Sequence, residues 1–206
     1  MICRRAMILA GILFIASNAF AEGDAAVGKT LFAVCQACHG PNGEGNQQLG
    51  APRIAGQMKW YLLRQIRNFR AGGRGVDPKD IFGLQMRAMA LTLADDQAVE
   101  DVVAYIRTFD AAPTPETITG DVANGKEKFV LCGACHGTGG EGIEPYNTPR
   151  LEGQHDWYMN RQLQNFRADI RGTHDIDIYG RQMAAMARLL SDRDVTDVIA
   201  YINSLE

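Results

Sequence analysis

Apolar residues recur at helical spacing in two corresponding stretches of the chain. The residues of each set occupy positions i, i+3, i+4 and i+7: Val99, Val102, Val103 and Ile106, then Val195, Val198, Ile199 and Ile202. This spacing gives a helix one apolar face that can be buried. No alternating strand pattern of any length competes with it. The sequence therefore predicts an all-α fold.

Further helices are expected in each half of the chain. An amphipathic helix should run from about residue 58 to 71, and another from about 155 to 168. An earlier helix should begin at Asp24 and again at Asp121, because aspartate is a favoured N-cap. Ser191, with Asp194 three positions later, resembles a capping box before the last helix.

These segments belong to an internal repeat with an offset of 97 residues. The corresponding pairs include Gly28/Gly125, Phe32/Phe129, Pro52/Pro149, Arg53/Arg150, Trp60/Trp157, Tyr61/Tyr158, Gln65/Gln162, Met86/Met183 and Met89/Met186, and, after a one-residue deletion, Tyr105/Tyr201. In each half, the glycine, phenylalanine and last tyrosine predict a close crossing of the first and last helices. Each half has a size at which an apolar core alone is marginal.

The repeat and the composition together predict four segments. Residues 1–21 have the features of a signal peptide: a basic start, an apolar run over 6–16 and a small-x-small cleavage site at Ala19-Phe20-Ala21. Residues 22–109 and 120–206 are expected to be two domains. Residues 110–119 should form a semi-rigid linker, because Pro113 and Pro115 stiffen it. Export to the periplasm follows, although retention of the leader as an anchor stays open.

The pentapeptide Cys35-Gln36-Ala37-Cys38-His39 and its copy Cys132-Gly133-Ala134-Cys135-His136 carry the chemistry. Two cysteines three positions apart lie on one side of a helical turn, where they can attach to the vinyl groups of a haem. CxxCH is the pattern of c-type haem attachment, and its histidine is the usual proximal iron ligand. The sequence therefore predicts two covalently attached haem c groups.

Two other uses of this pattern fit less well. A structural zinc site draws four ligands from one compact unit, whereas these two clusters lie 97 residues apart. A thioredoxin-like redox pair requires neither the histidine nor the duplication.

The second axial ligand should recur at the repeat offset if the two halves are equivalent. His155 and His174 have no histidine counterpart, so they are expected to be surface or helix-end residues. The two recurring methionine pairs remain, and a thioether opposite histidine is a known haem c arrangement. Spacing alone does not choose between the first and the second methionine of each pair, one of which is expected to pack in the core.

Further expectations concern the surroundings of the haem. A carbonyl near Pro52 or Pro149 could bind the second nitrogen of the proximal imidazole. The residues placed to bind a propionate are Trp60, Tyr61 and Arg64, and in the second half Trp157, Tyr158 and Arg161. An ordinary core or surface role is equally open for each of them.

The charge is unevenly distributed. After removal of residues 1–21 the chain has 19 basic and 24 acidic residues; residues 22–109 carry a net +1 and residues 110–206 a net −6. No basic face suggests nucleic-acid binding. The asymmetry predicts that the halves dock to differently charged partners or in one preferred orientation.

The ordered set of motifs resembles the dihaem cytochrome c4 family. The likeness rests on the leader, two CxxCH modules, the segments Pro52–Gln57 and Pro149–Gln154 each followed by a tyrosine, and an M-x-x-M element before the closing helix. It implies two cytochrome c domains packed with their haem propionate edges facing each other. It also implies Met86 and Met183 as iron ligands opposite His39 and His136, with thioether bonds at Cys35, Cys38, Cys132 and Cys135.

The resemblance further implies an electron carrier and not an enzyme. Its partners would be a quinol-oxidising cytochrome bc complex and a terminal haem-copper oxidase, with peripheral association with the inner membrane left open. A second hypothesis is the electron-accepting subunit of a periplasmic dehydrogenase complex, which should carry a sizeable apolar surface patch. A third, a catalytic haem enzyme, would require an open or exchangeable iron ligand.

Overall fold

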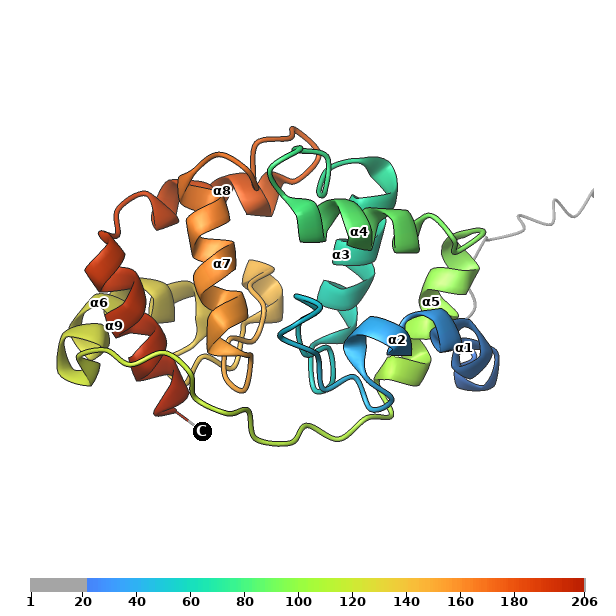
Figure 1. The fold of residues 1–206 in the computed structure, drawn as a ribbon, viewed down its shortest axis with the longest axis horizontal. Coiled ribbons are helices and arrows are strands. Elements are labelled where there is room, and N and C mark those ends of the chain that lie inside the picture. Colours follow the sequence, from blue (N-terminus) through green and yellow to red (C-terminus); the bar gives the residue numbers. More distant parts are fainter. Residues whose placement is uncertain (1–21, 206) are drawn as a thin grey trace, which may run out of the picture.

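The computed structural model describes residues 22–205, which form two helical lobes lying side by side (Figure 1). The first lobe contains α1 (Ala25–Leu31), the 3₁₀ turn η1 (Phe32–Val34), α2 (Gln36–His39), α3 (Lys59–Ala71), α4 (Ile81–Ala90) and α5 (Asp96–Ile106). The second contains α6 (Val122–His136), the 3₁₀ turn η2 (Glu144–Tyr146), α7 (Asp156–Arg167), α8 (Ile178–Ala187) and α9 (Asp192–Asn203). Between residues 22 and 205 the helices are joined by loops and turns, and the β-structure is limited to two isolated bridges, so the all-α prediction is confirmed.

The helix starts follow the predicted capping chemistry. Asp24 accepts hydrogen bonds from the amides of Ala26 and Val27 at the start of α1, and Asp121 caps α6 in the same way. Ser191 and Asp194 form the complete capping box of α9. These contacts satisfy amide donors that the first turn of a helix leaves unpaired.

The first and last helices of each lobe cross at a glycine. A Cβ atom built on Gly28 would lie 1.9 Å from the carbonyl oxygen of Asp101 in α5, and one built on Gly125 would lie 1.9 Å from that of Asp197 in α9. Aromatic pairs pack beside the crossings, with ring centroids 5.5 Å apart for Phe32 and Tyr105 and 5.2 Å apart for Phe129 and Tyr201. The predicted close crossing is confirmed in both lobes.

The two apolar faces predicted from the sequence form the centres of the two cores. Val99, Val102 and Val103 are fully buried in the first lobe around Phe32, as is the matching face of α9 in the second. The helical segment that leads into the CxxCH motif differs between the lobes. In the second lobe α6 is continuous to His136, whereas in the first lobe a 3₁₀ turn separates α1 from α2.

The segment between the lobes is extended and contains no helix (Figure 1). Its end is fixed on the second lobe by the Asp156 carboxylate, which accepts hydrogen bonds from the amide and hydroxyl of Thr117 and the amide of Ile118. Burial opposes the charge of this carboxylate, but these bonds outweigh it and lower the pKa of Asp156 below its ordinary value. The first lobe has Lys59 at the corresponding position, so the contact belongs to the second lobe alone.

The predicted signal peptide, residues 1–21, lies outside the described residues. Among the helices between residues 22 and 205, none combines the length and the apolar character needed to cross a bilayer. The exact domain limits at 22–109 and 120–206 remain predictions.

Candidate functional site

A continuous cavity of about 480 Å³ lies inside the molecule and is lined by both lobes. Its volume is in the range typical of cofactor sites. The sequence-predicted site residues all line it: Cys35, Cys38, His39, Met86 and Met89 from the first lobe, and Cys132, Cys135, His136, Met183 and Met186 from the second. The fold therefore brings the two donor sets, far apart in the sequence, to one interior space.

The two histidines have identical surroundings. Nδ1 of His39 lies 2.8 Å from the carbonyl oxygen of Pro52, and Nδ1 of His136 lies 2.9 Å from that of Pro149. A carbonyl can only accept, so Nδ1 carries the proton and Nε2 is the unprotonated nitrogen, which is available to bind a metal. Burial lowers the pKa of both imidazoles, although the hydrogen bond to the proline carbonyl opposes this shift. Both rings are thus held neutral and in fixed orientation.

The cysteine environment suits an uncharged sulfur. Burial raises the pKa of the Cys35 thiol to about 11, and it also raises that of Cys132. A thioether, which has no proton to lose, fits such surroundings better than a thiolate. Between residues 22 and 205 no group of three or more His, Cys, Asp or Glu could hold a metal ion by itself, so that part of the chain contains no zinc site of the ordinary kind.

The two methionines of each pair differ in burial. Met86 packs against the core of the first lobe, and Met183 packs against Phe166 and its neighbours in the second. Met89 and Met186 are 38% and 42% exposed. Both pairs line the cavity, but the first member of each is partly buried against the core, whereas the second is exposed.

The residues expected to bind propionates fall into two groups. Tyr61, Arg64 and Tyr158 line the cavity, whereas Trp60, Trp157 and Arg161 are absent from its lining within the described residues. The two arginines join the lobes: Arg64 donates to the carbonyl of Asn147 at 2.9 Å, and Arg161 donates to that of Gly50 at 2.5 Å.

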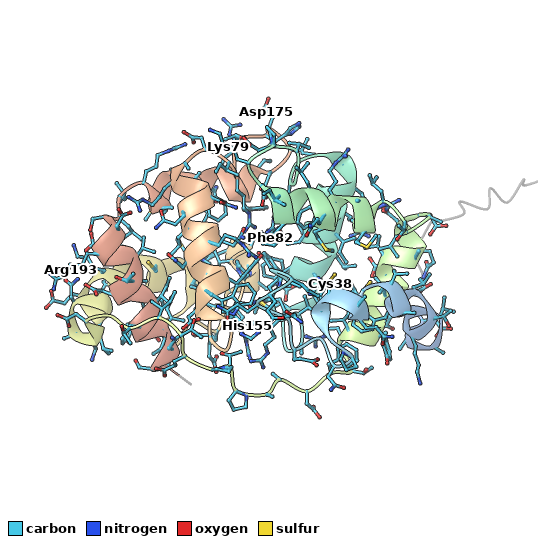
Figure 2. All side chains as sticks on the ribbon, in the orientation of Figure 1. Cys38, Lys79, Phe82, His155, Asp175 and Arg193 are labelled. Atoms are coloured by element: carbon cyan, nitrogen blue, oxygen red, sulfur yellow. The ribbon has the colours of Figure 1, made fainter. Side chains whose placement is uncertain are left out.

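Aromatic and imidazole rings complete this junction. The guanidinium of Arg161 stacks over the ring of Phe82, 4.3 Å from its centroid. Nε2 of His155 lies 2.7 Å from the carbonyl oxygen of Glu44 in the first lobe. Figure 2 shows Phe82 and His155 where the two lobes meet. His174 is exposed and accepts a hydrogen bond from the Ile176 amide, so neither of these histidines reaches the cavity.

Sequence reasoning missed a polar cluster at the junction of the lobes. Arg74 and Arg171 are buried there beside Gln65 and Gln162, and all four line the cavity. The signal was present in the sequence, because both arginines recur at the offset of 97 residues within otherwise irregular segments. What the repeat could not indicate is that the two copies meet.

The comparisons with known proteins agree with the division of the chain into two similar helical lobes. The family model described as cytochrome c matches residues 25–110 and again residues 122–206. Cytochrome c4 of Azotobacter vinelandii is 35% identical over 94% of this chain and 94% of its own length. The chain belongs to the cytochrome c4 family.

Two further proteins are similar to this chain. The crystal structure of reduced cytochrome c4 from Pseudomonas stutzeri superimposes with a TM-score of 0.69 and 31% identity, covering 89% of this chain and all of the other. A thiosulfate dehydrogenase electron acceptor of Stutzerimonas stutzeri is 30% identical over 81% of this chain and 76% of its own length.

Membership of the cytochrome c4 family gives the cavity its occupants, two covalently attached haem c groups. The described residues fit them. The cavity offers two CxxC pairs, two neutral imidazoles and soft thioether donors, and buried nitrogens of Arg64, Arg74 and Arg171 have no partner among residues 22–205. Unpaired guanidinium nitrogens of this kind suit the carboxylates of a haem.

Proposed function

We propose that the protein is a periplasmic dihaem electron carrier and not an enzyme. In this proposal Cys35 and Cys38 attach one haem, and His39 and Met86 bind its iron. The second haem is attached at Cys132 and Cys135, and its iron is bound by His136 and Met183. The supporting observation is the repeat of one complete donor set on each side of a single cavity.

The donor sets favour electron transfer over catalysis. An iron bound by both a histidine and a methionine would have no free position for a substrate, and the thioether would raise its reduction potential. The haems would supply one-electron chemistry. Burial lowers the pKa of both imidazoles, the carbonyls of Pro52 and Pro149 fix the orientation of the rings, and the largely apolar cavity would enclose the irons. Burial of this kind also tunes the potential.

The rim of the cavity is apolar on both lobes. Val34 and Leu49 in the first lobe and Leu131 and Leu189 in the second line the cavity and are exposed. Electrons can enter and leave where such side chains let a partner approach closely. A net −6 on the second half against +1 on the first would orient the partners.

The proposed partners follow from the family resemblance. They are a quinol-oxidising cytochrome bc complex as donor and a terminal haem-copper oxidase as acceptor. The alternative is that the protein accepts electrons from a periplasmic dehydrogenase. The similarity to a thiosulfate dehydrogenase electron acceptor supports this alternative.

Stopped-flow measurements with purified partners separate the two proposals. The oxidised dihaem protein is mixed either with a bc complex and quinol or with a thiosulfate dehydrogenase and thiosulfate. We expect faster reduction by the bc complex, with a rate that falls as salt is raised because steering by charge is screened. Faster reduction by the dehydrogenase would support the alternative, and reduction by neither would contradict both.

A further inference from the structure

The hydrogen bonds between the two lobes occur in matching pairs. Gln57 of the first lobe donates to the carbonyl oxygen of Arg150 at 3.1 Å, and Gln154 of the second lobe donates to that of Arg53 at 2.9 Å. The two donors are related by the repeat offset of 97 residues, and so are the two acceptors. Reciprocal contacts of this kind are what a twofold axis produces between two identical units.

Two arginines repeat this relation with aromatic rings. The guanidinium of Arg64 in α3 lies over the ring of Tyr179, 4.4 Å from its centroid, and that of Arg161 in α7 lies over Phe82, 4.3 Å from its centroid. Tyr179 and Phe82 occupy the same position of the repeat. A cation over an aromatic face is attracted to it, so each lobe offers the other the same arginine and the same kind of ring.

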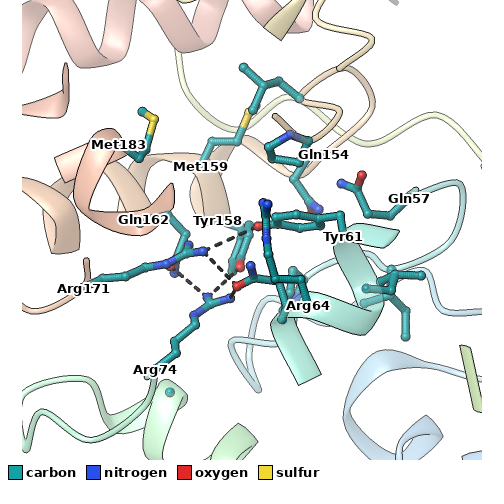
Figure 3. Close-up of a pocket in the computed structure, with 18 of the residues that line it drawn as sticks. Gln57, Tyr61, Arg64, Arg74, Gln154, Tyr158, Met159, Gln162, Arg171 and Met183 are labelled. Atoms are coloured by element: carbon teal, nitrogen blue, oxygen red, sulfur yellow. Dashed lines mark hydrogen bonds between the residues drawn. The ribbon is translucent and has the colours of Figure 1, made fainter. Parts of the chain in front are cut away.

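Buried polar side chains follow the same pattern, and Figure 3 shows Arg74, Arg171 and Gln162 together at the junction. Arg74 donates to Oε1 of Gln162 at 3.0 Å, and Arg171 donates to Oε1 of Gln65 at 3.1 Å. All four side chains are buried. Separating the lobes would remove these bonds from both members of each pair, which costs free energy.

The capping aspartates of α4 and α8 add another matching pair. Asn68 donates to Oδ1 of Asp177 at 3.0 Å, and Asn165 donates to Oδ1 of Asp80 at 3.5 Å. All of these contacts join residues 50–82 to residues 147–179, and none of them uses residues 110–119. Contact through this surface therefore does not require the linker.

We call the two matching sets the pairing surface. It consists of Gln57, Arg64, Asn68, Arg74 and Phe82 in the first lobe and Gln154, Arg161, Asn165, Arg171 and Tyr179 in the second, with the groups that they contact.

Two features make each lobe fit the other lobe better than a copy of itself. Nε2 of His155 lies 2.7 Å from the carbonyl oxygen of Glu44, whereas the first lobe has Met58 at the position of His155, and a methionine side chain has no N–H to donate. Two first lobes would therefore lack this contact. Residues 22–109 carry a net +1 and residues 110–206 a net −6, so two second lobes would repel each other.

We propose that the pairing surface accepts the complementary lobe of a second copy of this chain, so that two chains exchange lobes and form a dimer. Such an exchange loses little, because the swapped lobes make the same contacts as the lobes of one chain. In a single chain the linker keeps the lobes at an effective concentration of about millimolar. The monomer should therefore dominate in dilute solution, and the lobe-exchanged dimer should increase with protein concentration.

Cutting the linker of the folded, haem-loaded protein tests whether the surface holds the lobes by itself. A protease recognition sequence is inserted between Ala112 and Pro113, and the cut protein is examined by native mass spectrometry at micromolar concentration. We expect the two lobes to remain paired at the mass of the uncut chain. Lobes that separate after cleavage would overturn the proposal.

The same insertion reveals the exchange between copies. Isotope-labelled and unlabelled uncut chains are incubated together at millimolar concentration, and the dimer is isolated and then cut. Lobe exchange predicts pairs that contain the first lobe of one copy and the second lobe of the other. The absence of a dimer, a dimer that yields only the parental pairs, or same-lobe pairs as abundant as mixed pairs would contradict it.

Variants connect the pairing to the reciprocal contacts. Gln57→Ala and Gln154→Ala should each raise the dissociation constant of the cut pair by about two- to tenfold, and by similar factors, because each removes one copy of the same hydrogen bond. Gln97→Ala is the matched control, since Gln97 binds Asp101 within its own lobe, and it should leave the constant unchanged. His155→Met should raise the share of same-lobe pairs.

Analytical ultracentrifugation of the cut variants over a dilution series supplies these constants. An unchanged dissociation constant in both glutamine variants would overturn the proposal, as would weakening by Gln97→Ala alone. None of these readouts depends on which residues bind iron, so they are independent of the proposed electron-carrier function.

Discussion

Replacing Met86 by alanine is expected to abolish the thioether-to-iron charge-transfer band of one haem and to lower its reduction potential. The loss should be on the order of 0.1 V or more, within the roughly 0.8 V over which axial ligands set haem potentials. Met86 lines the cavity and packs against the core of its lobe, so it is the methionine that the fold holds in place. Met183→Ala should give the same result for the second haem.

Met89 and Met186 provide matched controls three residues away. They are 38% and 42% exposed, so their replacement by alanine should leave both bands and both potentials close to those of the parent protein. Near-infrared absorption and a redox titration of the four single variants make the comparison. Loss of a band in Met89→Ala or Met186→Ala, with Met86→Ala or Met183→Ala normal, would show that the second methionine of the pair is the ligand.

A second large effect is expected at the helix crossings. Gly28→Ala and Gly125→Ala should each lower the free energy of unfolding by about 2–4 kcal/mol, because inserting an atom into a packed site forces backbone shifts. The new Cβ would lie 1.9 Å from a backbone carbonyl oxygen in either case, and backbone cannot rotate away as a side chain can. Urea unfolding of the dihaem protein measures the loss.

Gly139 is the matched glycine control. Its nearest neighbour is the end of the flexible Glu141 side chain, 3.3 Å from an added Cβ, and its replacement by alanine should change stability by less than about 1 kcal/mol. Equal stability of Gly28→Ala and Gly139→Ala would mean that α1 and α5 are not packed as closely as described.

The sequence was sufficient for most features that lie within one lobe. The N-caps Asp24 and Asp121, the buried valine faces and the carbonyls beside the two histidines depend on contacts that local pattern and internal repeat report directly. The repeat was informative because a residue with a structural or chemical role in one copy should recur at the same position of the other copy. The all-α class and the two haem c groups follow from the same information.

Contacts between the lobes could not be predicted in this way. Arg74 and Arg171 recur at the repeat offset, but recurrence does not indicate that the two copies meet face to face. The Asp156 contact with Thr117 was hidden for the opposite reason, since position 59 holds a lysine and the repeat is broken there. Contacts between the two lobes depend on how the lobes dock, which the sequence pattern of either lobe does not indicate.

Burial separated the methionines where spacing did not. Met86 and Met89 both lie on the cavity side of α4, so the pattern alone left them equal. Their different contacts with the core became visible only in the folded lobe.

The most direct test of a dihaem carrier with closed irons is a carbon monoxide titration of the reduced protein, performed on material whose haem content has been measured. We predict two covalently bound haems per chain and an absorption spectrum that carbon monoxide does not change, because in the proposed function a histidine and a methionine would bind each iron. Fewer than two haems, or a carbon monoxide complex formed at either iron, would contradict this function.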